Sequence, residues 1–182
     1  MSNEELTKNV NKEILHLIRK TKVDALYAMK SHYNAAERLK RYTFWLGSSV
    51  VVLTVVVGSS IFATVSKSPS TNWRIGAGLL VLASGVLSAL QTFLRFSESS
   101  ALHKTAGDNF RVIFKKSQEI EHTYLGETIT KEEASKNISG LRDQADIFSR
   151  QSLAPSNADY RKTRAGIADK EAEYTQKELS ET

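Results

Sequence analysis

The 182-residue chain has no cysteine and only two prolines, and it contains two long segments without any charged residue or histidine. The absence of cysteine excludes a disulfide framework and a thiolate metal site within the chain, and it suits a reducing compartment. The uncharged segments span residues 44–65 and 75–94, and only residues 66–74 separate them. At a rise of about 1.5 Å per residue, each is long enough to cross a hydrocarbon core of about 30 Å. The sequence therefore predicts a two-pass membrane hairpin.

The alternative is a pair of buried helices in a soluble bundle. Such helices normally show a polar face every third or fourth residue, and neither segment has a charged one. The membrane interpretation is therefore favoured.

Positive charge near the predicted spans indicates their orientation. The hairpin loop carries only Lys67 and Arg74, whereas more basic residues flank the outer ends: Lys30, Arg38, Lys40, Arg41, Arg95, Lys104, Arg111, Lys115 and Lys116. This distribution predicts an inner-membrane, multi-pass protein with both termini cytoplasmic. The lipid bilayer is thus the first expected partner, and anionic headgroups explain the net charge of +5. Direct nucleic-acid binding is not expected, because no aromatic platform or glycine-rich phosphate loop accompanies the basic residues.

The polar arms have helical patterns, so the predicted fold class is all-α: a transmembrane helical hairpin whose long cytoplasmic extensions form a bundle. The expected divisions are an N-terminal helix over residues 1–43, the hairpin over 44–94, further helices over 95–154 and a charged C-terminal helix or tail over 155–182. We expect one helix to run from the N-terminal arm into the first span, and the second span to extend without interruption to about Tyr124. Gly126 is expected to end that helix, and Thr130 with Glu133 forms the capping-box signature of the next, which reaches about Gln151.

The second span combines a polar stripe with a stripe of small residues. Ser84, Ser88, Gln91 and Arg95 fall on one narrow face at 100° per residue, and they are candidate pore-lining residues. Gly78, Gly85 and Ala89 lie on a neighbouring face and are candidate helix-packing residues. An equally favoured interpretation is that the serines bond to their own helix carbonyls while Gln91 and Arg95 mark the membrane interface.

Signals of catalysis are absent from the sequence. His16, His32, His103 and His122 have no metal-ligand spacing, and no Walker loop, HExxH or GxSxG motif occurs. We therefore expect no enzyme activity, no metal site and no cofactor.

Three motifs carry a family resemblance: residues 32–38 (HYNAAER), residues 87–93 (LSALQTF) and residues 103–106 (HKTA). In these the chain resembles the SLATT family, the SMODS- and SLOG-associating two-transmembrane effector domains of prokaryotic conflict systems. The resemblance implies an effector that perturbs the membrane during phage infection under the control of a partner that makes or senses a nucleotide signal. It also singles out His103, for which a helix-packing or interfacial role is favoured over proton sensing.

The favoured function is thus an oligomerising, gated membrane effector of antiviral defence. Its expected partners are other copies of the chain and a separate nucleotide-signal synthase or sensor. The alternative is a non-conducting membrane anchor or scaffold that recruits a cytosolic sensor.

Overall fold

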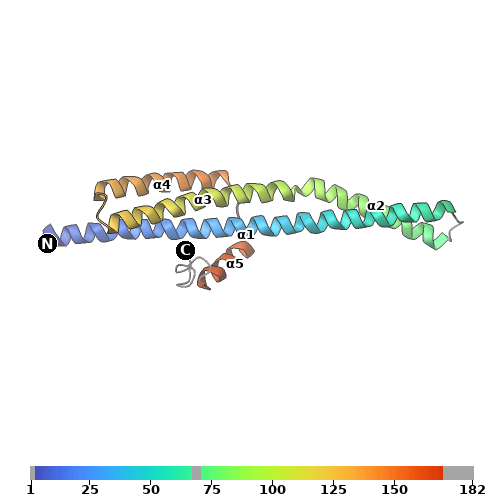
Figure 1. Ribbon diagram of the computed structural model, residues 1–182, viewed down its shortest axis with the longest axis horizontal. Coiled ribbons are helices and arrows are strands. Elements are labelled where there is room, and N and C mark those ends of the chain that lie inside the picture. The colour runs from blue at the N-terminus through green and yellow to red at the C-terminus, as the bar shows by residue number, and fades with distance from the viewer. Residues whose placement is uncertain (1–2, 67–70, 170–182) are drawn as a thin grey trace, which may run out of the picture. The chain divides into compact units, whose positions relative to one another are not determined.

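The computed structural model describes residues 3–66 and 71–169, and this part of the chain is helical without a strand. Its helices are α1 (Asn3–Ser66), α2 (Thr71–Leu94), α3 (Phe96–Leu125), α4 (Lys131–Gln151) and α5 (Asn157–Ala168), as Figure 1 shows. The predicted all-α class is confirmed. The chain divides into two compact units, a bundle (residues 1–36 and 101–182) and a hairpin unit (residues 37–100).

Helix α1 is one uninterrupted helix from Asn3 to Ser66, as expected from the sequence. Neither proline nor glycine occurs in it before Gly47, so nothing removes a backbone hydrogen bond or favours another conformation there. The N-terminal arm and the first predicted span therefore belong to one element.

The helix of the second span ends with the span, which corrects the expectation of a continuous helix to Tyr124. Helix α2 ends at Leu94, and Arg95 adopts a φ of 44° before α3 begins at Phe96. A left-handed conformation is costly for a residue with a Cβ atom. Because position 95 is not a glycine, nothing in the sequence indicates this break. The Arg95 carbonyl accepts a hydrogen bond from the Ser99 amide (3.0 Å), and its Nε atom lies 2.7 Å from the Glu98 carboxylate. Arg95 thus ends one helix and supports the start of the next.

The turn from α3 to α4 confirms the predicted capping box. The Glu133 amide donates to the Thr130 hydroxyl (3.2 Å), and the Thr130 amide donates to the Glu133 carboxylate (3.1 Å). Helix α3 ends at Leu125, next to the expected stop at Gly126, but the left-handed residue is Glu127, with a φ of 54°. Capping satisfies amides that have no partner inside α4 and fixes where this helix starts.

The bundle core lies between α1, α3 and α4, and α4 lies alongside α3 (Figure 1). Its buried residues recur at helical spacing on each element: Ile18 and Ala25 on α1, Ile113 and Ile120 on α3, and Ala134, Ile138 and Leu141 on α4. Each helix therefore turns one apolar stripe inward, as the amphipathic pattern of the arms predicts.

Helix α5 starts with a second capping box, inside the region predicted as a charged C-terminal helix or tail. The Asp159 carboxylate accepts hydrogen bonds from the Ser156 amide (2.9 Å) and hydroxyl (2.6 Å). The part of this predicted region (residues 155–182) beyond Asp169 lies outside the described residues.

The hairpin unit pairs the second half of α1 with α2. One stripe on each helix is half-buried: Thr43, Leu46, Val50, Leu53 and Val57 on α1, and Ala77, Leu80, Ser84, Leu87 and Gln91 on α2. The seven-residue repeat of both stripes is typical of coiled-coil-like helix packing. The predicted loop falls partly on residues 67–70, which are outside the described residues.

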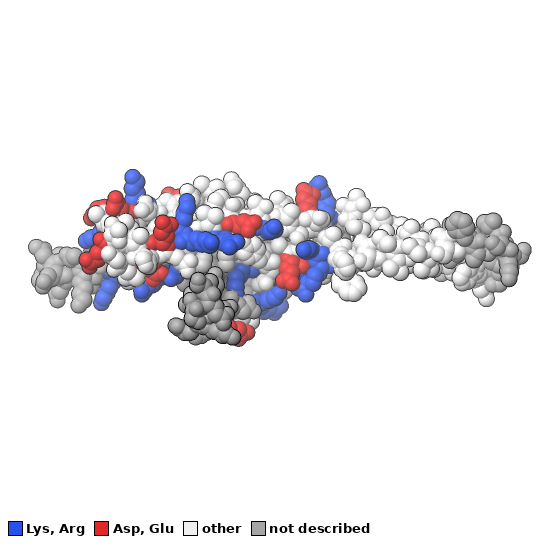
Figure 2. Space-filling model, viewed as in Figure 1, with Lys and Arg blue, Asp and Glu red and all other residues white. Residues whose placement is uncertain are grey.

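The hairpin exposes most of its large apolar side chains. Val52 is 60% exposed, Leu82 is 67% exposed and Phe93 is 82% exposed. Figure 2 shows Lys, Arg, Asp and Glu interspersed over the bundle, whereas the two uncharged segments, residues 44–65 and 75–94, contain none of them. Both helices of the hairpin are long and apolar enough to cross a membrane. Exposed apolar surface of this extent is stable in contact with lipid.

Candidate functional site

A cluster of polar contacts in the bundle lies on one turn of α1, residues 31–34. Successive helical residues are rotated by 100°, so this turn faces different neighbours. His32 and Tyr33 contact α3, whereas Ser31 and Asn34 contact α5. We call this cluster the junction; it comprises Ser31, His32, Tyr33, Asn34, His103, Gly107, Asp108, Phe110, Asp159 and Thr163. The motif in residues 32–38 thus begins where α1 meets two helices.

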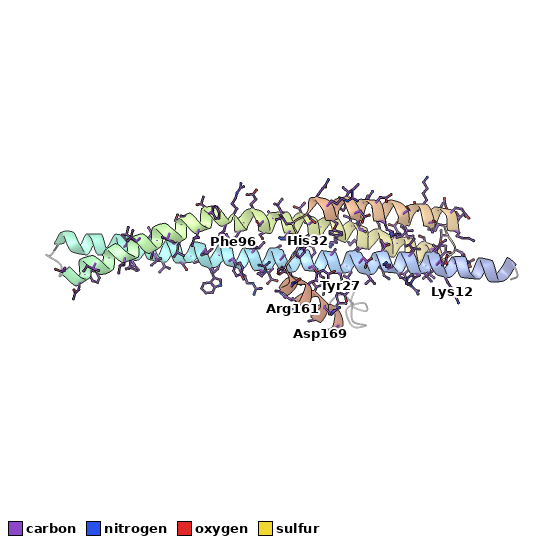
Figure 3. The ribbon with its side chains drawn as sticks, turned by 180° about the vertical axis from the view of Figure 1, so that it is seen from behind. Lys12, Tyr27, His32, Phe96, Arg161 and Asp169 are labelled. Atoms are coloured by element: carbon purple, nitrogen blue, oxygen red, sulfur yellow. The ribbon has the colours of Figure 1, made fainter. Side chains whose placement is uncertain are left out.

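The centre of the junction is a buried pair of histidines, His32 and His103 (Figure 3 labels His32 on α1). Their Nδ1 atoms are 3.1 Å apart, and the residues are 3% and 5% exposed. The His32 ring stacks on the Phe110 ring, with ring centroids 5.6 Å apart. The Phe110 ring in turn contacts the Phe148 ring of α4 edge to face, with centroids 6.4 Å apart. The pair therefore links α1 to α3 and reaches α4 through an aromatic contact.

Burial governs the protonation of this pair. The pKa of His32 is lowered from 6.5 to about 4, first by desolvation and second by repulsion from His103. His32 is therefore neutral near pH 7. A hydrogen bond between two Nδ1 atoms then needs one ring to carry its proton on Nδ1 and the other ring to accept it.

Tyr33 fits against the backbone of α3 at Gly107. The Tyr33 hydroxyl donates to the Asp108 carboxylate (2.7 Å). A Cβ atom at position 107 would lie 2.8 Å from ring atoms of Tyr33, closer than side chains approach one another. Burial, and then the bond to Asp108, raise the pKa of Tyr33. Gly107 therefore allows α1 and α3 to approach closely beside the histidine pair.

The opposite side of the junction is a small polar contact with α5. The Thr163 hydroxyl oxygen accepts hydrogen bonds from Ser31 Oγ and Asn34 Nδ2, both at 3.0 Å. Nearby, Tyr27 and Tyr160 stack with centroids 6.4 Å apart, and Figure 3 labels Tyr27 on α1 and Arg161 on α5. Helix α5 thus contacts α1 through hydrogen bonds and a stacked pair of tyrosines.

A comparison with protein families matches residues 14–178 to the SMODS and SLOG-associating 2TM effector domain family 4. The chain belongs to the SLATT family. Searches of curated proteins and of solved structures give no match. The resemblance found in the sequence motifs is thereby confirmed, and this SLATT chain is a two-transmembrane effector domain.

The candidate pore-lining residues of this SLATT chain do not share one environment. Ser84 and Gln91 lie on the half-buried stripe that faces α1, whereas Ser88 is exposed. A Cβ atom at Gly47 of α1 would lie 3.5 Å from Gln91 Nε2, which places the amide against that helix. Arg95 lies beyond the end of α2. A pore lining by this set stays a prediction.

The candidate helix-packing residues are on the outer surface of the hairpin. Gly78, Gly85 and Ala89 are all exposed. A Cβ atom added at Gly78 or Gly85 would meet nothing within 4 Å. The two stripes of α2 therefore have different neighbours: one faces α1, and the other is open in the single chain.

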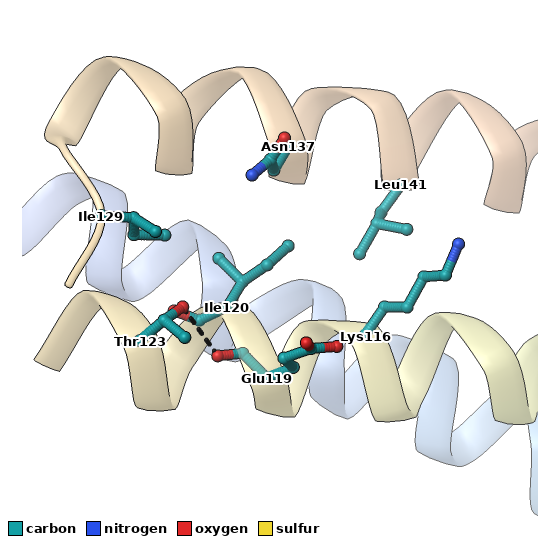
Figure 4. A pocket seen from close by; sticks show the side chains of 7 residues that line it. All are labelled: Lys116, Glu119, Ile120, Thr123, Ile129, Asn137 and Leu141. Atoms are coloured by element: carbon teal, nitrogen blue, oxygen red, sulfur yellow. Dashed lines mark hydrogen bonds between the residues drawn. The ribbon is translucent and has the colours of Figure 1, made fainter. Parts of the chain in front are cut away.

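The other polar features of the bundle lie away from the junction. Lys22 and Arg19 pair with the Glu121 carboxylate, and these pairings lower its pKa although burial acts in the other direction. A pocket of about 360 Å³ opens between α3 and α4, lined by Lys116, Glu119, Ile120, Thr123, Ile129, Asn137 and Leu141 (Figure 4). Among the described residues, no three His, Cys, Asp or Glu side chains gather where a metal ion would bind.

The sequence motifs pointed to the histidines but not to their contact. His32 and His103 are 71 positions apart in the chain, and neither motif indicates that the two rings meet. The α5 side of the junction was missed as well. A signal for it exists in the small and polar residues Asp159, Thr163 and Gly166, whose helical spacing matches the buried face of α5.

Proposed function

We propose that this SLATT chain is an inner-membrane effector of antiviral defence that oligomerises through its hairpin and permeabilises the membrane. Activation would follow from a partner that makes or senses a nucleotide signal. Both termini, and with them the bundle, would lie in the cytoplasm, where such a partner is found.

The observation that carries the proposal is the open small-residue face of α2. The hairpin already has an internal packing stripe, so Gly78, Gly85 and Ala89 are not needed to hold α1 and α2 together. In lipid, where apolar surfaces gain little from leaving the solvent, small residues favour helix association because they let two backbones approach closely. The open face therefore suits contact with another copy of the hairpin.

The polar residues of α2 suit a water path once several hairpins assemble. Ser88 is exposed one turn from Gly85, and Ser84 and Gln91 lie on the half-buried stripe that faces α1. A polar side chain in a spanning helix is costly against lipid and is stabilised by facing water or another helix. Assembly would bring these side chains towards a shared axis.

The test pairs crosslinking of the reconstituted chain with dye release from liposomes. Gly85→Leu should abolish both, because the larger side chain separates neighbouring copies while the single hairpin has room for it. Val86→Leu is the matched control, since Val86 is 60% exposed on another face, and it should leave both readouts unchanged. Gln91→Leu should leave crosslinking intact but reduce dye release.

Two outcomes would contradict parts of the proposal. Wild-type dye release by Gln91→Leu would exclude the predicted stripe as a pore lining. A wild-type chain that crosslinks but never releases dye, with or without its partner, would favour the non-conducting scaffold.

A further inference from the structure

We propose that the contact between His32 and His103 is an acid-sensitive latch, which closes the bundle while both imidazoles are neutral and opens it when they take up protons. The latch concerns the bundle alone, so it does not depend on whether the chain conducts. It adds a proton-dependent opening to a bundle for which only a protein partner has been inferred as the trigger.

The geometry of the pair makes the contact depend on its proton count. With both rings neutral, one Nδ1–H donates to the bare Nδ1 of the other ring across 3.1 Å. A first added proton places a cation in a site that is 3–5% exposed and stacked on Phe110. A second added proton makes both Nδ1 atoms donors, so that two N–H groups of like charge face each other. The first proton therefore destabilises the closed bundle by burying a charge, and the second breaks the contact.

The helices around the pair carry charged residues in the turns near it. These residues are Lys30 and Glu37 on α1, Lys104, Asp108 and Arg111 on α3, Asp146 and Arg150 on α4, and Asp159 and Lys162 on α5.

Each of the two carboxylates of the junction accepts a hydrogen bond from a residue outside the histidine pair. Asp108 accepts from the Tyr33 hydroxyl (2.7 Å), and Asp159 accepts from Ser156 at the start of α5. The causes that dominate the pKa of His32 are accordingly burial and His103, and both disfavour the cation.

The direction of the pH effect follows from this lowered pKa. The folded bundle holds His32 neutral down to about pH 4, whereas the opened chain binds a proton near its ordinary pKa of 6.5. The opened state therefore binds more protons between these values. The stabilisation by the pair is complete above pH 6.5 and is lost as the pH falls from 6.5 towards 4.

The experiment is hydrogen exchange of α3 amides in the full chain, reconstituted in lipid nanodiscs, at pH 7, 6 and 5 and corrected for intrinsic exchange. In the wild type, protection should fall by up to about tenfold per pH unit below 6.5, the effect of one extra proton bound on opening. The double variant His32→Asn/His103→Asn should lose most of this slope, because an amide pair can bridge the helices without titrating.

The matched control is His16→Asn/His122→Asn, which removes two exposed histidines of the same bundle. This variant should keep the wild-type slope. The proposal is overturned if the His32→Asn/His103→Asn variant retains the wild-type slope, or if the control loses it.

A second measurement keeps the proposal testable if the double variant does not fold. Nitrogen-15 spectra of histidine-labelled wild type at pH 7 should show one buried ring protonated at Nδ1 and the other with a bare Nδ1. Two bare Nδ1 atoms, with protection that falls on adding EDTA, would show a bridging metal ion instead and would overturn the latch. A protonated imidazolium at both positions would do the same.

Discussion

The bundle and the hairpin are both built of α-helices, but the bundle buries large apolar side chains that the hairpin exposes. In the bundle, Ile113 and Ile138 are fully buried, and Figure 2 shows many charged residues on the surface. In the hairpin, Leu82 is 67% exposed and Phe93 is 82% exposed, while Ser84 and Gln91 lie on the half-buried stripe. The difference is one of solvent: water drives apolar groups inward, whereas lipid does not.

The comparison also shows where polar groups are placed in the two regions. Each region has polar side chains on an internal contact face, a histidine pair in the bundle and Ser84 with Gln91 in the hairpin. Burial is costly for such groups unless they find partners, so both contacts favour one register of their helices.

The largest contrast is expected from one substitution made in both regions. Leu141→Ala removes a side chain that is 6% exposed in the bundle core, and it should lower the free energy of unfolding by about 2–5 kcal/mol. Leu82→Ala removes a side chain that is exposed on the hairpin, and it should change the free energy of unfolding by less than about 0.5 kcal/mol. Hydrogen exchange of bundle and hairpin amides in nanodiscs measures both effects. Equal losses would show that the hairpin surface is packed rather than in contact with lipid.

An intermediate effect is expected at the glycine beside the junction. Gly107→Ala places a methyl group 2.8 Å from the Tyr33 ring, which its hydroxyl bond to Asp108 keeps in place. The resulting overpacking should destabilise the bundle by about 1–3 kcal/mol. Gly140→Ala in α4 meets nothing within 4 Å and should instead stabilise it by about 0.5–1 kcal/mol. Thermal unfolding followed by circular dichroism compares the two variants, and a shift of the same sign for both would refute the close approach of Tyr33 to α3.

The smallest effect is expected at the break between α2 and α3. Arg95→Gly relieves the left-handed conformation but loses the exposed pair with Glu98, so stability should change by less than about 0.5 kcal/mol. Arg95→Val should cost about 1 kcal/mol more, because a β-branched residue tolerates positive φ poorly. Exchange rates of amides 96–100 report this local change. Identical rates in the two variants would mean that the break does not need a left-handed residue.

Much of the fold was predictable from local patterns. The lengths of the uncharged segments predicted two spans, and the lack of proline and glycine before Gly47 predicted one long first helix. The pair Thr130 and Glu133 predicted the start of α4. These signals act over a few residues or along one helix face, so they can be recognised without knowing the rest of the structure.

By itself, the sequence determined that this protein has a lipid-facing hairpin and polar helical arms, because charge and hydropathy along a helix decide which solvent it tolerates. Only the tertiary structure decided which of these faces meet. It brought His32 to His103 across 71 positions and Ser31 to Thr163 across 132. It also turned Ser84 and Gln91 towards α1 and ended the helix of the second span before Arg95. Such contacts depend on the register between helices. The packing of many side chains at once sets this register, so no short sequence pattern indicates it.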